Sequence, residues 1–253
     1  MEVHHHTHAH AKKNWEAHLW EFLMLFLAVT AGFLVENLRE HYIELKREEI
    51  FIKSFVEDLR QDTANISANI QIRSSKILIM DSLIKLLNSP DPNANGQSAY
   101  YWGRRVTRST LFQSNDRTIK QLKNSGGLRL IRNQKASNTI MEYDQAIDYV
   151  NYLQTTRETL EVTALYPLLA KLFDGQVLET MINGMEINRP SGNPPLRTTN
   201  KDVILDITYF LHQYKTSSIV IITRLQTVRD VAIKTMQFFQ KEYNLSERNH
   251  LEK

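Results

Sequence analysis

The chain has 253 residues, of which 42% are hydrophobic and 23% are charged, values typical of a globular protein of one or two domains. It contains 8 glycines, 6 prolines and no cysteine, which argues against turn-rich all-β folds and excludes disulfide frameworks, thiolate metal sites and cysteine catalysis. The formal net charge of +3 is too small to indicate a nucleic-acid partner by itself.

Residues 1–18 form a histidine-rich leader. Its candidate metal ligands are five closely spaced imidazoles: His4, His5, His6, His8 and His10. Neutral imidazole is a common ligand of zinc, copper and nickel, so a divalent transition metal is the one cofactor that the sequence suggests, and none is required. Two other interpretations stay open: a solvated leader that binds metal only adventitiously, and a pH-sensitive leader that contacts lipid headgroups.

An apolar segment at residues 19–36 predicts one transmembrane helix. Glu21 is its single charge before Glu36, and the apolar run between its ends reaches about 26 Å as a helix, close to the ~30 Å core of a bilayer. Trp15 and Trp20 lie where an aromatic belt would anchor one interface. A cleaved signal peptide and a buried core helix are the alternatives. Glu21 argues against the first, and an apolar surface around the whole helix argues against the second.

The charges that flank this segment give a weak orientation signal. Lys12 and Lys13 precede it, whereas Arg39, Lys46 and Arg47 follow it among several acidic residues. Because acidic residues count little in the positive-inside rule, the bias is small. The expected arrangement has the amino terminus in the cytoplasm and the main domain on the other side of the membrane.

One narrow stripe of the predicted span carries small and charged residues. At about 100° per residue, this stripe contains Glu21, Leu25, Ala28, Gly32, Glu36 and Arg39. Ala28 and Gly32 form a small-xxx-small pair, which lets two helices approach closely. A carboxylate near lipid is expensive, so the stripe predicts contact with another copy of the chain, a homo-oligomer. The competing interpretation is that Glu21 and Glu36 lie at the two interfaces and reach water.

The remaining sequence predicts an all-α fold, in which the transmembrane helix continues into a long stalk and an antiparallel helical bundle. The stalk helix, residues 37–90, enters the bundle with a bend near 61–65 and ends at the proline-rich segment that begins at Pro90. Residues 91–253 form the rest of the helical extramembrane domain. They include helices over about 136–173, kinked at Pro167, and about 201–243, with an irregular loop at 174–199.

Positive charge is concentrated in residues 104–135, which hold nine basic residues and one acidic residue. A solvated face, contact with anionic lipid headgroups, and pairing with the acidic stretch at 36–49 all explain this segment. Nucleic acid is not an expected partner, because the chain lacks a groove-reading element.

No known catalytic motif occurs in the chain. Phosphate-binding loops, dinucleotide-binding glycine motifs, zinc-protease helices and nucleophile elbows are all missing from the sequence. The chain is therefore not expected to be an enzyme.

Three stretches carry a resemblance: the histidine-rich leader, WEFLMLFLAVTAGFLVENLREHYIE at 20–44 and SNDRTIKQLKNSGGLRLI at 114–131. Together they resemble an uncharacterised family of single-span, His-rich-leader membrane proteins from Gram-negative bacteria. The resemblance implies an anchored protein with a helical extramembrane domain, and it carries over no functional residue.

The leading functional hypothesis is a non-enzymatic inner-membrane protein that self-associates through its span and stalk and acts as a scaffold or binding subunit. The first alternative is a homo-oligomeric cation channel or metal-transport subunit with rings of Glu21 and Glu36. The second is an extracytoplasmic sensor that lacks its own output domain.

Overall fold

The computed structural model describes residues 15–108, 111–124 and 126–245. The elements in chain order are α1 (Trp15–Leu87), η1 (Pro92–Asn95), α2 (Gly96–Val106), α3 (Arg117–Asn124), η2 (Gly127–Leu130), α4 (Gln134–Leu160), the π turn η3 (Glu161–Leu165), α5 (Tyr166–Leu172), α6 (Gly175–Thr180), β1 (Ile182–Asn183), β2 (Glu186–Ile187) and α7 (Lys201–Glu242). The all-α class is confirmed, since the only strands in the described part of the chain are the two short ones of a hairpin.

The chain divides into two compact units, one ending at Ile50 and the other starting at Phe51. In the first unit, the described residues all belong to α1, and most of their side chains are exposed. Of the described helices, α1 is the one long and apolar enough to cross a membrane by length and composition, and none of its apolar window is buried.

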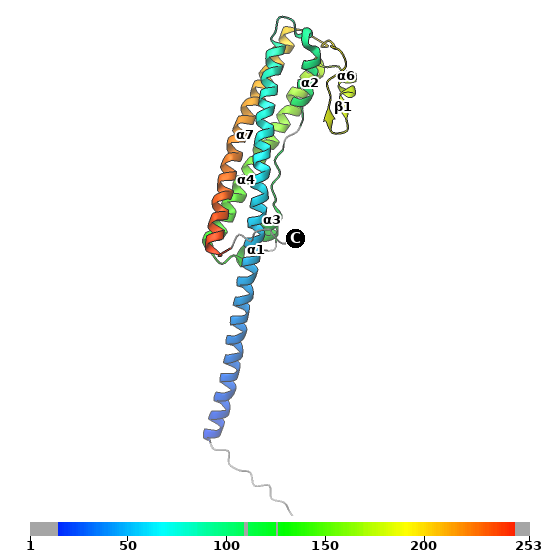
Figure 1. The fold of residues 1–253 in the computed structure, drawn as a ribbon. Helices are drawn as coiled ribbons and strands as arrows, with labels where there is room; N and C mark the ends of the chain where they lie inside the picture. The colour runs from blue at the N-terminus through cyan, green and yellow to red at the C-terminus, as the bar shows by residue number, and fades with distance from the viewer. Residues whose placement is uncertain (1–14, 109–110, 125, 246–253) are drawn as a thin grey trace, which may run out of the picture. The chain divides into compact units, whose positions relative to one another are not determined.

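The second unit is built on three long helices: the later part of α1, α4 and α7 (Figure 1). Contacts between α1 and α4 advance together along both helices, because Tyr143 bonds to Asp62 and Gln154 bonds to Arg73. These two helices therefore run in the same direction. The bundle thus contains one parallel pair, which the prediction of an antiparallel bundle did not include. α7 runs antiparallel to α1, since Phe239 packs against Phe55 and Lys215 pairs with Asp81.

A parallel pair needs a connection that returns along the bundle. Helix α2 and the segment that follows it make this return, and bring the chain to α3 before α4 begins (Figure 1). Asn133 caps α4 by accepting from the backbone N–H groups of Lys135 and Ala136. Asn200 caps α7 in the same way. Such caps satisfy amide groups that have no partner inside the helix.

Buried residues on all three helices alternate at steps of three and four, the 3.5-residue period of coiled-coil packing. On α1 they include Ile52, Phe55, Leu59, Asp62, Ile66, Asn69, Arg73, Lys76, Met80, Leu83 and Leu87. On α7 they include Ile204, Ile207, Leu211, Tyr214, Ser218, Ile221, Leu225, Val228, Ala232, Thr235 and Phe239. The apolar members of the α1 row, such as Phe55, Leu59, Ile66 and Leu87, are almost completely buried. Ile50, by contrast, is 62% exposed.

The π turn changes this register in the α4 region. Buried Gln154, Arg157 and Glu161 keep the three–four spacing, and the next buried position is Leu165, a further four residues on. A π turn inserts one residue into a helix, which accounts for the shift. The turn lies just before Pro167, the residue at which a kink was predicted, and α1 shows no break at the bend predicted near 61–65.

The predicted irregular loop at 174–199 contains α6 and the hairpin of β1 and β2, in which Ile182 pairs with Ile187. Gly184 in the hairpin turn has a φ of 60°, a backbone conformation that glycine adopts without strain. The predicted last helix, about 201–243, is confirmed as α7.

Candidate functional site

A layer of charged side chains divides the core of the bundle. The four members of this layer, Arg73, Lys76, Arg157 and Glu161, are all buried, and we call them the basic layer. One hydrophobic cluster contains the core residues on one side of it, including Ile66, Val150 and Ile221. A second contains those on the other side, including Met80, Leu165 and Leu211.

Arg73 of α1 is held by neutral side chains. Its Nε donates to the Oδ1 atom of Asn69 at 2.7 Å, and its Nη2 donates to the Oε1 atom of Gln154 at 2.8 Å. Burial lowers the pKa of Arg73 to about 10, with a further decrease from nearby Arg157. Arg73 thus remains a cation at neutral pH, inside the bundle.

Lys76 lies one turn further along α1 and bridges two other parts of the fold. Its Nζ donates to the hydroxyl of Tyr214 on α7 at 2.5 Å and to the backbone carbonyl of Arg108. Burial lowers the pKa of Lys76 to about 7, an effect that the Glu161 carboxylate opposes and the two arginines reinforce. The ammonium group of Lys76 therefore loses its proton close to neutral pH.

Arg157 and Glu161 form the part of the layer that α4 and the π turn contribute. The Nη2 atom of Arg157 lies 2.9 Å from the Oε2 atom of Glu161, and the guanidinium carbon lies 3.7 Å from the centroid of the Tyr214 ring. The hydroxyl of Tyr166 donates to the carbonyl of Thr107 at 2.9 Å and also lies 3.4 Å from the Oε1 atom of Glu161. Burial raises the pKa of Glu161, while the neighbouring cations lower it.

The basic layer borders two hollows. A cavity of about 240 Å³ is lined by Arg157, Glu161 and Tyr214 together with apolar side chains. A wider groove of about 970 Å³ is lined by Lys76 and Arg105 among others. Small-molecule sites usually combine an apolar wall with a few polar groups, and the smaller cavity has this composition.

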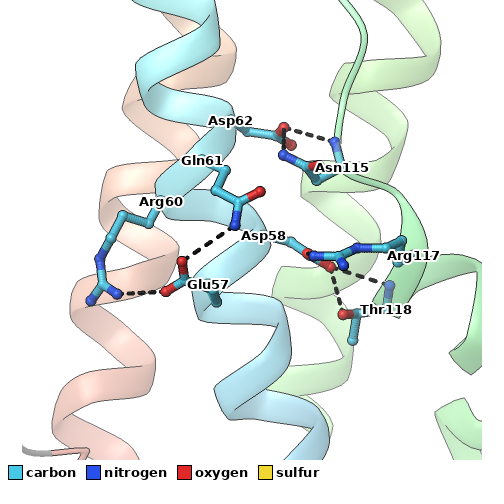
Figure 2. A network of polar contacts seen from close by, with 8 residues as sticks. All are labelled: Glu57, Asp58, Arg60, Gln61, Asp62, Asn115, Arg117 and Thr118. Carbon is cyan, nitrogen blue, oxygen red and sulfur yellow. Dashed lines mark hydrogen bonds and ion pairs between the residues drawn. The ribbon is translucent and has the colours of Figure 1, made fainter. Parts of the chain in front are cut away.

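A second polar network holds the returning segment against α1, as Figure 2 shows. Asp62 accepts from the backbone N–H of Asn115 at 2.8 Å and from the hydroxyl of Tyr143 at 2.6 Å. Asp58 accepts from the backbone N–H and hydroxyl of Thr118, and pairs with Arg117 at 3.1 Å. These carboxylates satisfy backbone groups that would otherwise be buried without a partner, so the network is structural.

The residues of the predicted oligomer face all lie on α1. Leu25 is 67% exposed, and a Cβ placed on Gly32 would meet no atom within 4 Å. Arg39 donates to both carboxylate oxygens of Glu36, at 3.0 and 2.7 Å. His18 lies 3.7 Å from Glu21. The structure thus places two charges of the predicted face in a mutual ion pair.

The predicted metal ligands, His4, His5, His6, His8 and His10, lie outside the described residues. Across residues 15–108, 111–124 and 126–245, no group of three or more His, Cys, Asp or Glu side chains is arranged to hold a metal ion.

Several basic residues of the segment 104–135 have partners within the bundle. Arg117 pairs with Asp58, Lys120 with Asp116 and Lys123 with Asp144. Lys135 lies over the ring of Phe238 at 5.0 Å. The segment is therefore partly engaged in holding α3 and α4 in place.

The basic layer contains no recognised sequence motif. The helical spacing of the sequence nevertheless marks its members as core positions. Arg73 and Lys76 lie in the same row of α1 as Ile66 and Met80, and Arg157 lies in the same row of α4 as Val150. Charged residues at core positions of a heptad are costly, and they often mark a specific role.

Comparison of the chain with protein-family models, with curated proteins and with solved structures gave no match.

Proposed function

We propose that this protein is a non-enzymatic, single-span protein of the bacterial inner membrane, which self-associates through its span and serves as a scaffold or binding subunit. The observation that carries the proposal is the exposure of the apolar part of α1, where none of the most apolar window is buried. Phe22, Val29 and Phe33 are 64%, 66% and 71% exposed. Removing such surface from water is favourable by about 25 cal/mol per Å², and a bilayer supplies that environment.

The predicted orientation is part of this proposal. The amino terminus lies in the cytoplasm and the bundle in the periplasm, as the flanking basic residues favour. Anionic lipid headgroups are the proposed partner of the basic segment at 104–135. A divalent metal at the histidine leader is a separate proposal, which metal titration of a leader peptide tests directly.

Self-association through the span is supported by the open surface around Gly32. Because a Cβ there would meet nothing within 4 Å, the position leaves room for a second helix. With Ala28 one turn earlier, it provides a close-packing surface for helices in a membrane.

The Glu36–Arg39 ion pair favours a scaffold over a cation channel. A ring of carboxylates selects cations through its unbalanced negative charge. Arg39 neutralises Glu36 within the same helix, at 2.7 Å, so a ring of these pairs would have little net charge.

Two measurements test the proposal. Alkaline carbonate should leave the full-length chain in the membrane pellet, and release into the supernatant would contradict a transmembrane anchor. Native mass in detergent should exceed that of the 29.5 kDa monomer. Gly32→Leu should lower this mass. Thr30→Leu is the matched control, because Thr30 lies about 160° around the helix axis from Gly32 and is therefore outside the predicted contact face. A monomeric parent protein, or equal masses for both variants, would contradict self-association through this face.

A further inference from the structure

The cavity beside Arg157 has the size and walls of a site for a small ligand. Its volume is about 240 Å³, and Leu160, Leu165 and Phe210 give it an apolar wall. Pockets for drug-sized ligands measure roughly 300–1,000 Å³, so this cavity fits a smaller molecule. Tyr209 and Ser217 also line it.

One polar atom of this cavity's lining residues has no partner in the protein. Arg157 is only 8% exposed, and its Nε makes no hydrogen bond, although its Nη2 is bound to Glu161. Leaving a charged donor buried without an acceptor is expensive. A carboxylate oxygen is the acceptor that a guanidinium binds most strongly.

The charge of the surrounding layer also favours an anion. Two arginines, Arg73 and Arg157, share one buried carboxylate, Glu161, and Lys76 adds further positive charge when it is protonated. Glu161 already accepts from Arg157 and Tyr166. A ligand with a single negative charge therefore reduces the excess positive charge and leaves the existing ion pair in place.

We propose that this cavity binds a small organic carboxylate with an apolar body. The ligand carboxylate pairs with the guanidinium of Arg157, and its apolar body lies against Leu160, Leu165 and Phe210. This inference goes beyond the proposed membrane role and does not depend on it, because the residues involved all belong to the second unit.

The test uses the full-length chain in detergent and three probes: benzoate, its neutral analogue benzamide, and acetate, which has the charge without the apolar body. Binding is followed by ligand-observed NMR, with empty micelles as the blank. Benzoate should bind at least tenfold more tightly than either of the other two. Equal binding of benzoate and benzamide would overturn recognition of the charge, and equal binding of acetate would overturn the apolar site. Absence of binding by all three would overturn the proposal itself.

Two variants and a control locate the site. Arg157→Gln should weaken benzoate binding at least tenfold, since it removes the charged donor. Ser217→Leu keeps Arg157, fills the cavity and should weaken binding similarly. Its hydroxyl donates to the carbonyl of Gln213 in its own helix, so the loss of this bond should leave the fold intact.

Arg224→Gln is the matched control, because Arg224 also lies over a tyrosine, Tyr149, at 5.3 Å, and does not line the cavity. Circular dichroism confirms that each variant is folded. Unchanged affinity in Ser217→Leu, or an equal loss in Arg224→Gln, would overturn the assignment to this cavity.

Discussion

Tyr214 contacts two cations from two different helices. Its hydroxyl accepts from Lys76 of α1 at 2.5 Å, and its ring centroid lies 3.7 Å from the guanidinium carbon of Arg157 on α4. One aromatic side chain of α7 thus joins all three long helices at the basic layer. The tyrosine supplies an acceptor for an ammonium group and a π face for a guanidinium, which no aliphatic residue provides.

The first prediction concerns the Tyr214 hydroxyl. Tyr214→Phe keeps the ring over Arg157 and removes an acceptor from buried Lys76, so the free energy of unfolding should fall by about 1–3 kcal/mol. Tyr149→Phe is the control, since Tyr149 is 45% exposed, and its effect should stay within about 0.5 kcal/mol. Urea unfolding followed by circular dichroism measures both. Equal effects of the two variants would show that the Lys76 contact contributes nothing.

The second prediction concerns pH. The pKa of Lys76 is about 7 in the folded protein, below its ordinary value of 10.5, because burial disfavours the charged form. Between these pH values the unfolded chain holds a proton on Lys76 that the folded chain has lost. The contribution of Lys76 to the free energy of unfolding therefore rises as pH increases from about 7 to about 10.5, and is constant below that range.

Lys76→Met isolates this contribution. The variant should be more stable than the parent at pH 7, by about 1–4 kcal/mol, and the difference should shrink towards pH 10.5. The neighbouring charged groups, Arg73, Arg157 and Glu161, are the same in both proteins. Lys85→Met, which removes an exposed lysine of the same helix, controls for the loss of one positive charge. A stability difference that does not change with pH would contradict the low pKa.

The third prediction compares two neighbouring carboxylates that Figure 2 shows together. Asp58 is 2% exposed and accepts from the backbone N–H and hydroxyl of Thr118. Asp58→Ala leaves these donors buried and should lower the free energy of unfolding by about 3 kcal/mol. Glu57 pairs with Arg60 on the surface, so Glu57→Ala should cost less than about 0.5 kcal/mol. Chemical denaturation of both variants measures the difference, and similar values would refute a structural role for Asp58.

The fourth prediction concerns close packing at the start of α2. A Cβ on Gly96 would lie 1.9 Å from the carbonyl oxygen of Pro194, whereas a Cβ on Gly175 would meet no atom within 4 Å. Gly96→Ala should therefore destabilise the fold by about 1–3 kcal/mol. Gly175→Ala should be neutral or slightly stabilising, because alanine restricts the unfolded chain. Thermal unfolding compares the two, and an unchanged melting temperature for Gly96→Ala would contradict the observed contact.

Local patterns in the sequence were enough to predict the long helices, although not the unbroken course of α1 through residues 61–65. The exposed apolar part of α1, its end at Leu87 before Pro90, and the extent of α7 all follow from periodicity, composition and helix-breaking residues close in the chain. The glycines and prolines within 174–199 predicted an irregular loop there, and the structure adds a short helix and a hairpin.

The tertiary structure alone decided which charged residues share the core. Arg73 and Gln154 are 81 positions apart, and Lys76 and Tyr214 are 138 apart. Helical periodicity places each of them on a buried face. Their meeting depends on the direction and register of whole helices, and those depend on the returning segment and on the residue that the π turn inserts. Because these are properties of long-range packing, the basic layer and its cavity appear only when the three helices are assembled.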